Sequence, residues 1–186
     1  MCCFPPPGVT LDATNRARAA NRMIVIHSPR LELRQFQITD APEVFACITP
    51  TVTRFMRWEP PTWSEYLARC EERLRAPDPN TFSFVIRRRD NHECLGMTAL
   101  EDSSSSSPEL GLWLRESAHG QGYGREVVTA VAGWTHEHLG KESFLYPVAA
   151  QNTASRRIAE GLHGEIIEKR TNPKYESVVY KIPWKP

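Results

Sequence analysis

The sequence predicts a single α/β domain built from strands and helices. Between about positions 30 and 182, runs with the two-residue period of strands alternate with runs at the three- to four-residue spacing of helices. Two pairs of strand-like runs are separated only by short turns, which is typical of antiparallel hairpins. The chain has 186 residues, of which 40% are hydrophobic and 24% charged, so one globular domain can bury a sizeable core.

The composition argues against several classes of function. The formal net charge of +1 gives no general attraction to nucleic acid. No apolar run approaches the roughly 20 residues that cross a bilayer, so no membrane segment is predicted. The five cysteines lack the paired spacing of a zinc site or a disulfide framework. We therefore predict no metal site, and reduced thiols in a cytoplasmic protein.

The first 22 residues differ from the rest of the chain. Pro5-Pro6-Pro7-Gly8 resists regular structure, and the segment lacks the continuous apolar stretch of a secretory signal. We expect residues 1–22 to be a disordered N-terminal extension and residues 23–186 to form the domain.

The first part of the domain is predicted to hold a strand and two helices. Arg30–Arg34 alternates polar and apolar residues, as a half-buried strand does. Asp40, with Glu43 three positions later, has the form of a helix start with a capping acid, and Pro50 is expected to stop that helix. Thr62–Glu65 is a second capping box, and apolar residues follow it at helical spacing.

A hairpin and a third strand come next. Thr81–Arg88 and Cys94–Leu100 are strand-like runs joined by a short turn. Asp102–Pro108 contains five consecutive serines and is predicted to be a flexible surface loop. Glu109–Leu114 is the third strand, and it leads into a glycine-rich stretch.

The C-terminal part alternates helices and strands. Arg125–Leu139 has one apolar face, which predicts a packed helix. Phe144–Val148 is a short apolar strand in which Pro147 implies a bend or an edge. Another helix opens at Asn152. The chain closes with two strands predicted to pair with each other, Glu165–Lys169 and Ser177–Ile182.

The glycine-rich stretch reads His119-Gly120-Gln121-Gly122-Tyr123-Gly124-Arg125-Glu126. Glycine lets the backbone turn tightly and lets a ligand approach main-chain amides. The first N–H groups of the following helix have no helical partner and carry partial positive charge, so the stretch could bind a phosphate. Its spacing fits neither a P-loop nor a dinucleotide fingerprint. A glycine-rich turn without a ligand is the alternative.

Four pieces of the sequence, in this order and spacing, resemble the GNAT acetyltransferase family, and within it the ribosomal-protein N-terminal acetyltransferases. His119-x-x-Gly122-x-Gly124 is similar to the family's coenzyme A loop, Gln/Arg-x-x-Gly-x-Gly/Ala, except that histidine stands first. The other pieces are Arg30–Arg34 with Asp40, Glu109–Leu114, and Asn152-x-x-Ser155 with the residues up to Gly164. The resemblance covers about residues 28–183. It implies a mixed, mostly antiparallel sheet flanked by helices.

The resemblance also implies acetyl-coenzyme A as the acetyl donor. Main-chain N–H groups of the loop would hold its pyrophosphate, and its pantetheine arm would lie along the preceding strand like an added strand. A neutral His119 can still hydrogen-bond a phosphate. The implied cofactor-binding residues are Leu112, Trp113, Leu114, His119, Gly120, Gln121, Gly122, Tyr123, Gly124, Arg125 and Asn152.

Two residues are candidates for catalysis. Glu109 is the first candidate for a general base, acting through water, and Glu101 is the second. An exposed charge at a strand edge is the alternative reading of Glu109. Ser155 could hydrogen-bond the departing thiolate, because Ala159 stands where some family members have a tyrosine acid. A purely structural cap of the helix by Asn152 and Ser155 is the alternative there.

The predicted function is an acetyl-coenzyme A-dependent N-acetyltransferase that transfers acetyl directly to a primary amine. The acceptor would be a protein N-terminus or a small-molecule amine, and the enzyme a monomer or homodimer. The alternatives are a non-catalytic coenzyme A-binding module of the same fold and a phosphate-binding regulatory domain unrelated to coenzyme A. Candidates for acceptor contacts, or else for packing alone, are Arg57, Trp58, Trp63 and Tyr66.

Overall fold

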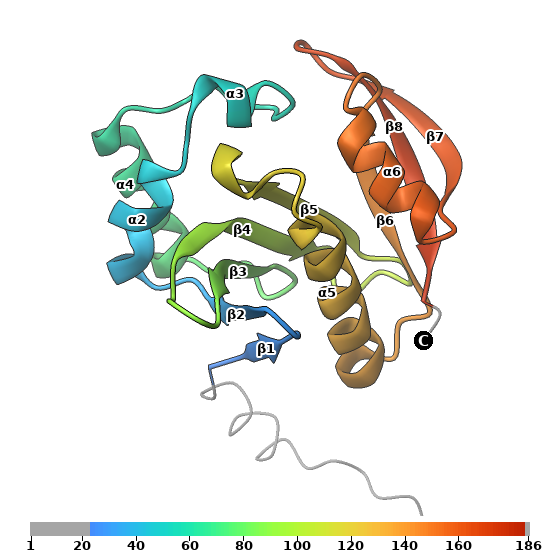
Figure 1. The fold of residues 1–186 in the computed structure, drawn as a ribbon, viewed down its shortest axis with the longest axis horizontal. Helices are drawn as coiled ribbons and strands as arrows, with labels where there is room; N and C mark the ends of the chain where they lie inside the picture. The colour runs from blue at the N-terminus through green and yellow to red at the C-terminus, as the bar shows by residue number, and fades with distance from the viewer. Residues whose placement is uncertain (1–22, 185–186) are drawn as a thin grey trace, which may run out of the picture.

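The computed structural model describes residues 23–184, which form one eight-stranded sheet with helices on both faces (Figure 1). The strand order in space is β1-β2-β3-β4-β5-β6-β8-β7. Every neighbouring pair is antiparallel except β5 and β6, so the predicted mixed, mostly antiparallel sheet is confirmed. The predicted extension, residues 1–22, lies outside the described residues. The strands are β1 (Val25–His27), β2 (Leu31–Gln35), β3 (Phe82–Arg88), β4 (Cys94–Glu101), β5 (Glu109–Leu114), β6 (Ser143–Ala149), β7 (Glu165–Thr171) and β8 (Glu176–Pro183).

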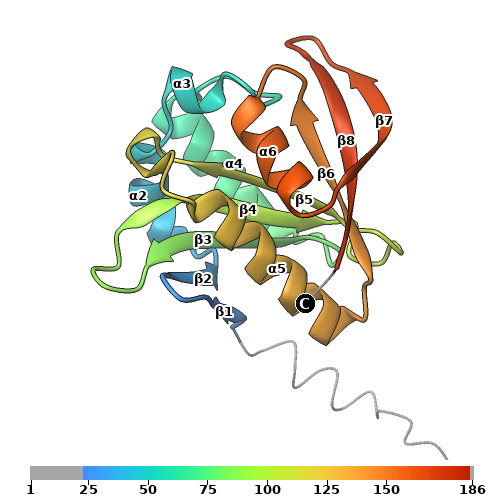
Figure 2. The ribbon, with the colours of Figure 1, turned by 45° about the vertical axis from the view of Figure 1, so that its right-hand side comes forward.

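The helices divide between the two faces. Figure 2 shows α5 (Tyr123–Leu139) and α6 (Thr153–Gly161) together on one face. On the other face lie α2 (Ala41–Ala46) and α4 (Trp63–Arg75), with the short α3 (Pro50–Thr53) at the rim. None of the helices in residues 23–184 is long and apolar enough to cross a membrane. Two 3-10 helices, η1 and η2, span Ile38–Asp40 and Glu116–Ala118.

The face under α5 holds the larger core. Val127, Val128 and Val131 of α5 are fully buried against strand side chains such as Leu33 and Leu110. Full burial of such a side chain is worth about 1.5–3 kcal/mol relative to leaving it in water. The face under α2 has a much smaller set of buried apolar side chains, namely Val44, Cys47, Val85 and Cys94.

A buried carboxylate, Asp40, supports the smaller core. Asp40 is 3% exposed, and its Oδ1 accepts from Arg34 Nη2 at 2.5 Å and from Arg87 Nη2 at 3.1 Å. Its Oδ2 accepts from the Gln37 N–H at 2.8 Å. Helix α2 does begin directly after Asp40, but the expectation that this side chain caps the helix is wrong. Both carboxylate oxygens are taken by these three donors instead.

Pro50 also differs from the expectation. Helix α2 ends at Ala46, and Pro50 is the first residue of α3, where a missing N–H leaves no hydrogen bond unmade. The capping box at the start of α4 is confirmed. The Thr62 N–H donates to Glu65 Oε2 at 2.8 Å, and the Glu65 N–H donates to Thr62 Oγ1 at 3.4 Å.

Candidate active site

Strands β5 and β6 pair at one rung, Glu109 with Leu145, and then part. The Leu145 N–H donates to the Pro108 carbonyl at 2.8 Å. Main-chain groups point to alternate sides of a strand, so the nitrogen of Pro147 faces β5 as well. Proline has no N–H, so the ladder cannot continue there, in agreement with the edge that Pro147 predicts. We call the unpaired edges of β5 and β6 beyond this rung the splay.

On the β5 side, the splay offers the main-chain groups of Leu112. The Arg115 N–H donates to a β4 carbonyl, so by alternation Trp113 also points its main-chain groups to β4. Leu112 and Leu114 therefore point theirs into the splay. The Leu114 carbonyl is already engaged, since His119 Nε2 lies 2.8 Å from it. Leu112 is thus the predicted strand contact that best fits an added strand, whereas His119 orders the loop.

The loop before α5 presents a run of main-chain donors. From Gly120 to Arg125, no main-chain N–H donates to an acceptor in the described part of the chain. The first helical bond runs from the Glu126 N–H to the Gly122 carbonyl at 3.2 Å. Gly122 has a φ of 81°, which glycine adopts without strain. Unpaired donors at the start of a 17-residue helix are suited to an anion. We call them the anion socket.

Arg30 clamps this socket from the start of β2. Its Nε lies 2.7 Å from Glu126 Oε2, and its N–H donates to Glu126 Oε1 at 2.8 Å. Its Nη1 donates to the Gln121 carbonyl at 3.0 Å, and the guanidinium lies 4.4 Å from the centre of the Tyr123 ring. Ser28 Oγ donates to Glu126 Oε1 at 2.6 Å. Burial alone would raise the pKa of Glu126, but the hydrogen bonds from Ser28 and Arg30 lower it below its ordinary value.

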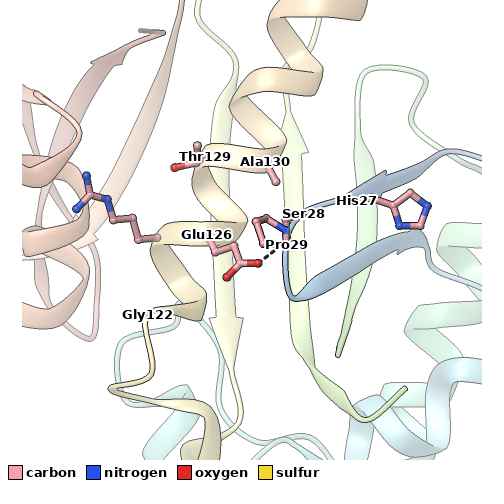
Figure 3. Close-up of a pocket in the computed structure, with 8 residues that line it drawn as sticks. His27, Ser28, Pro29, Gly122, Glu126, Thr129 and Ala130 are labelled. Carbon is pink, nitrogen blue, oxygen red and sulfur yellow. Dashed lines mark hydrogen bonds between the residues drawn. The ribbon is translucent and has the colours of Figure 1, made fainter. Parts of the chain in front are cut away.

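An open hollow lies beside this clamp, between α5 and the β1–β2 turn (Figure 3). It is not lined by any residue of β5 or β6, so it extends the surface of the anion socket away from the splay. Sequence reasoning missed the clamp because Arg30 and Glu126 are 96 positions apart and no local pattern links them. The lining residues are His27, Ser28, Pro29, Gly122, Arg125, Glu126, Thr129 and Ala130.

On the β6 side, the start of α6 meets a buried tyrosine. Asn152 Oδ1 accepts from the Ser155 N–H at 3.1 Å, so the predicted cap is confirmed. Ser155 Oγ lies 2.9 Å from the hydroxyl of Tyr146 on β6. Burial raises the pKa of Tyr146 to about 12, so this phenol keeps its proton at physiological pH. Sequence reasoning found Ser155 but missed Tyr146, which it read only as part of an apolar strand.

Helices α5 and α6 approach closely where the splay opens. A Cβ atom on Gly124 would lie 2.9 Å from Ile158 Cδ1 of α6, so a larger residue here would displace the Ile158 side chain. The Arg125 side chain also reaches α6, donating from Nη2 to the Gly161 carbonyl at 3.2 Å. The start of α5, which carries the anion socket, is therefore held against the second half of α6, the helix that begins beside Ser155.

Glu109 lies at the closed end of the splay, on the opposite face of the sheet. It alternates with Leu110, which is buried under α5. Its Oε2 lies 2.7 Å from Arg170 Nη1 of β7. Two hydrogen bonds raise the pKa of Arg170: the larger contribution comes from Glu168 and the next from Glu109. Glu101, the second candidate base, is exposed and stands directly across from Glu109 on β4.

The predicted acceptor contacts do not all gather at one place. The Trp58 ring lies 6.5 Å from that of Trp113 in an edge-to-face arrangement, so Trp58 does approach β5. Trp63 and Tyr66 instead pack on Phe45 of α2, with ring centres 5.3 and 5.5 Å from it. These two side chains therefore make packing contacts, which was the alternative to contact with the acceptor.

A lysine ties the β7–β8 turn to this side of the molecule. Lys174 Nζ lies 2.8 Å from Glu59 Oε1 and donates to the Thr53 and Trp58 carbonyls at 3.1 and 3.3 Å. The segment that carries Trp58 is thereby fixed against the hairpin. No local pattern in the sequence indicated this contact, which spans 121 positions to Thr53.

Comparison with known proteins gives a family model and several solved structures. The model, described as an acetyltransferase (GNAT) domain, matches residues 30–165. No curated protein sequence matches the chain. A GNAT-family acetyltransferase from Bacillus anthracis is 15% identical, with a TM-score of 0.74 over 86% of this chain and 98% of that chain.

Two further structures carry functional names. The ribosomal L7/L12 α-N-protein acetyltransferase RimL is 16% identical, with a TM-score of 0.73 over 89% of this chain and 97% of that chain. Spermidine N-acetyltransferase from Vibrio cholerae, solved with CoA and spermine, is 14% identical, with a TM-score of 0.72 over 84% of this chain and 96% of that chain. At these identities the likeness shows a shared fold.

Proposed function

This chain belongs to the GNAT acetyltransferase family and is an N-acetyltransferase, and we propose that acetyl-coenzyme A is its donor, bound across the anion socket and the splay. The observation that carries this proposal is the run of N–H groups from Gly120 to Arg125 that have no acceptor within residues 23–184. This run lies beside a strand edge whose main-chain groups are likewise unpaired in that part of the chain. The first feature suits a pyrophosphate, and the second suits the amides of a pantetheine arm.

We assign the roles of the remaining site residues from their positions. The Leu112 N–H would hydrogen-bond the pantetheine arm or the carbonyl of the thioester, where it would stabilise developing negative charge. Ser155 would donate to the departing sulfur from the start of α6. Glu109 would take the proton of the attacking nitrogen through water from the opposite face of the sheet.

The reaction is a direct transfer. The amine nitrogen bonds to the acetyl carbon, the carbon–sulfur bond breaks, and the nitrogen loses one proton. Acetyl-coenzyme A supplies an activated acyl group whose thiol has a pKa near 8.5, so the leaving sulfur needs only a hydrogen bond. Holding amine and thioester in register can supply about 7–11 kcal/mol of the barrier reduction.

We propose a weakly basic primary amine as the acceptor, either a protein N-terminus or a small-molecule amine. An α-amino group has a pKa of about 7.7–8.0 and is roughly a tenth deprotonated at pH 7, whereas lysine, near 10.4, is almost wholly protonated. A base that acts only through water is sufficient for an α-amino group, because part of it is already deprotonated at pH 7.

We also propose that the enzyme works in the cytoplasm, as a monomer or homodimer. Within residues 23–184, Cys47, Cys70 and Cys94 are all buried and form no disulfide, which supports a reducing compartment.

An acetyl-transfer assay tests the proposal. The purified protein is incubated with acetyl-coenzyme A and a panel of peptide N-termini, polyamines and small amines, and both free thiol and acetylated product are measured. We expect one thiol released for each acetylated amine, with peptides blocked at the N-terminus and free only at lysine reacting poorly. Absence of acetyl-coenzyme A binding in calorimetric titration would contradict the proposed donor.

A further inference from the structure

Tyr146 is a buried phenol with one polar partner. Its side chain lies on β6, opposite Tyr180 of β8, and it is 2% exposed. In the described part of the chain, its hydroxyl makes one hydrogen bond, to Ser155 Oγ at 2.9 Å. Burial raises the pKa of Tyr146 to about 12, so the hydroxyl keeps its proton and needs a hydrogen-bond acceptor for it.

The proton count decides which hydroxyl donates. If Ser155 donated to Tyr146, the tyrosine proton would be buried without an acceptor, and an unsatisfied buried donor is costly. If Tyr146 donates, its only proton is satisfied, and Ser155 is left with its own proton free. The Ser155 hydroxyl is half-buried and has no other hydrogen bond among residues 23–184. Tyr146 is therefore the donor.

The neighbouring tyrosine shows the contrast. Tyr180 is 1% exposed and stands on the same rung as Tyr146. Its hydroxyl accepts from Arg156 Nε at 3.0 Å and donates to Glu160 Oε1 at 2.8 Å. The Tyr180 hydroxyl therefore has both a donor and an acceptor within the protein. Of the two tyrosines on this rung, it is Tyr146 whose contact leaves a hydroxyl proton free, on Ser155 at the start of α6.

We propose that Tyr146 is a positioning residue for the reaction: by donating to Ser155 Oγ, it fixes the serine hydroxyl so that the serine proton is directed to the departing sulfur. This inference rests on the proposed function. Hydrogen bonds in a chain strengthen one another, so Ser155 becomes a better donor than an isolated serine. Tyr146 keeps its proton throughout. The sulfur carries the electron pair of the broken carbon–sulfur bond and takes its proton from solvent as it leaves.

Steady-state kinetics on Tyr146→Phe, Ser155→Ala and the double variant test the assignment, with Tyr180→Phe as the matched control. Phenylalanine keeps the buried ring and removes only the hydroxyl. We expect Tyr146→Phe to lower kcat roughly tenfold while KM for acetyl-coenzyme A stays within about twofold, because the bond strengthens as charge develops on sulfur. The double variant should be no slower than Ser155→Ala. Tyr180→Phe should lower the thermal midpoint and leave kcat within about twofold.

The outcomes separate this inference from the function on which it rests. Equal kcat losses in Tyr146→Phe and Tyr180→Phe, or additive losses in the double variant, would reduce Tyr146 to packing and overturn the inference. An unchanged kcat in Tyr146→Phe would also overturn the inference. A raised kcat would overturn it too, and would mean that Ser155 donates to Tyr146. If Ser155→Ala alone keeps full turnover, both the serine role and the inference fall. If the unmodified protein acetylates no amine, the proposed function fails first.

Discussion

The two faces of the sheet are built by different forces. Under α5, a large apolar core holds the helix whose start forms the anion socket. Under α2, few apolar side chains are buried, and Asp40 with two arginines supplements them. Ion pairs also hold the rim of that face, where Arg170 binds Glu109 and Lys174 binds Glu59.

The difference suggests a division of labour. Close apolar packing holds one rigid arrangement, which suits a socket for a fixed ligand. At the rim, long charged side chains can change partners at small cost, because ion pairs open to solvent contribute little. The buried Asp40 pairs are stronger and act on stability. We therefore expect changes on the α5 face to affect donor binding or the departure of the thiolate, and changes on the α2 face to affect stability, proton transfer or acceptor binding.

The largest effect is expected from Gly122→Val. Valine at a φ of 81° is strained, so the loop must move and the donors of the anion socket lose their alignment. Calorimetric titration should show acetyl-coenzyme A binding weakened by roughly 100-fold or more. Gly140→Val is the matched control, since Gly140 ends the same helix with a φ of 65° and an added Cβ there would meet no atom within 4 Å. Equal loss of binding in both variants would contradict a local role for the socket.

Asp40→Asn tests the other face. The change leaves two arginine side chains, 18% and 13% exposed, without their shared countercharge. Removing one partner of a buried ion pair costs about 3 kcal/mol of unfolding free energy, and urea unfolding should show this as a lower midpoint. Asp90→Asn, which breaks an exposed pair with Arg88, should leave the midpoint unchanged. A midpoint for Asp40→Asn equal to that of the unmodified protein would show that this face needs no ionic support.

Much of the α5 face could be predicted from the sequence because its determinants are local. The apolar period of residues 125–139, the loop glycines and the Asn152 cap each act within one or two helical turns. Pro147 predicted an edge, and the splay begins beside it. These features depend on spacing and backbone chemistry, which neighbouring residues display directly.

The contacts that hold the site could not be predicted, because they join distant segments. Arg30 reaches Glu126 across 96 positions, and Arg170 reaches Glu109 across 61. Asp40 had the local form of a helix cap, but two arginines from adjacent strands bind its Oδ1, and the Gln37 N–H binds its Oδ2. Tyr146 looked like one apolar strand residue among several. Its meaning depends on Ser155, which the fold alone places beside it.

Glu109→Gln tests proton transfer on the α2 face. Glutamine keeps the shape of the side chain but cannot accept a proton, so kcat should fall roughly 100-fold with KM for acetyl-coenzyme A nearly unchanged. Glu168→Gln is the matched control, because Glu168 is the other carboxylate bound to Arg170. It should leave kcat within about twofold. If Glu101→Gln slows turnover and Glu109→Gln does not, the base is Glu101.

The smallest effect is expected from Lys174→Met, which removes the tie between the β7–β8 turn and the Trp58 segment. Glu59 is 73% exposed, so the ion pair itself contributes little, and the two carbonyl contacts carry the stabilisation. A loss of about 1 kcal/mol in ordering this rim would raise KM for the amine roughly fivefold. KM for acetyl-coenzyme A should not change, since the anion socket lies on the other face.

Lys181→Met, on the exposed side of β8, controls for the loss of one positive charge from the same hairpin. If both lysine variants raise KM for the amine equally, general charge rather than the tie attracts the acceptor. If Lys174→Met instead raises KM for acetyl-coenzyme A, the two faces are mechanically coupled. In that case rigid packing under α5 does not isolate the donor site. The division between the faces would then fail at the β7–β8 hairpin, which pairs with β6 through β8 and contacts α3 through Lys174.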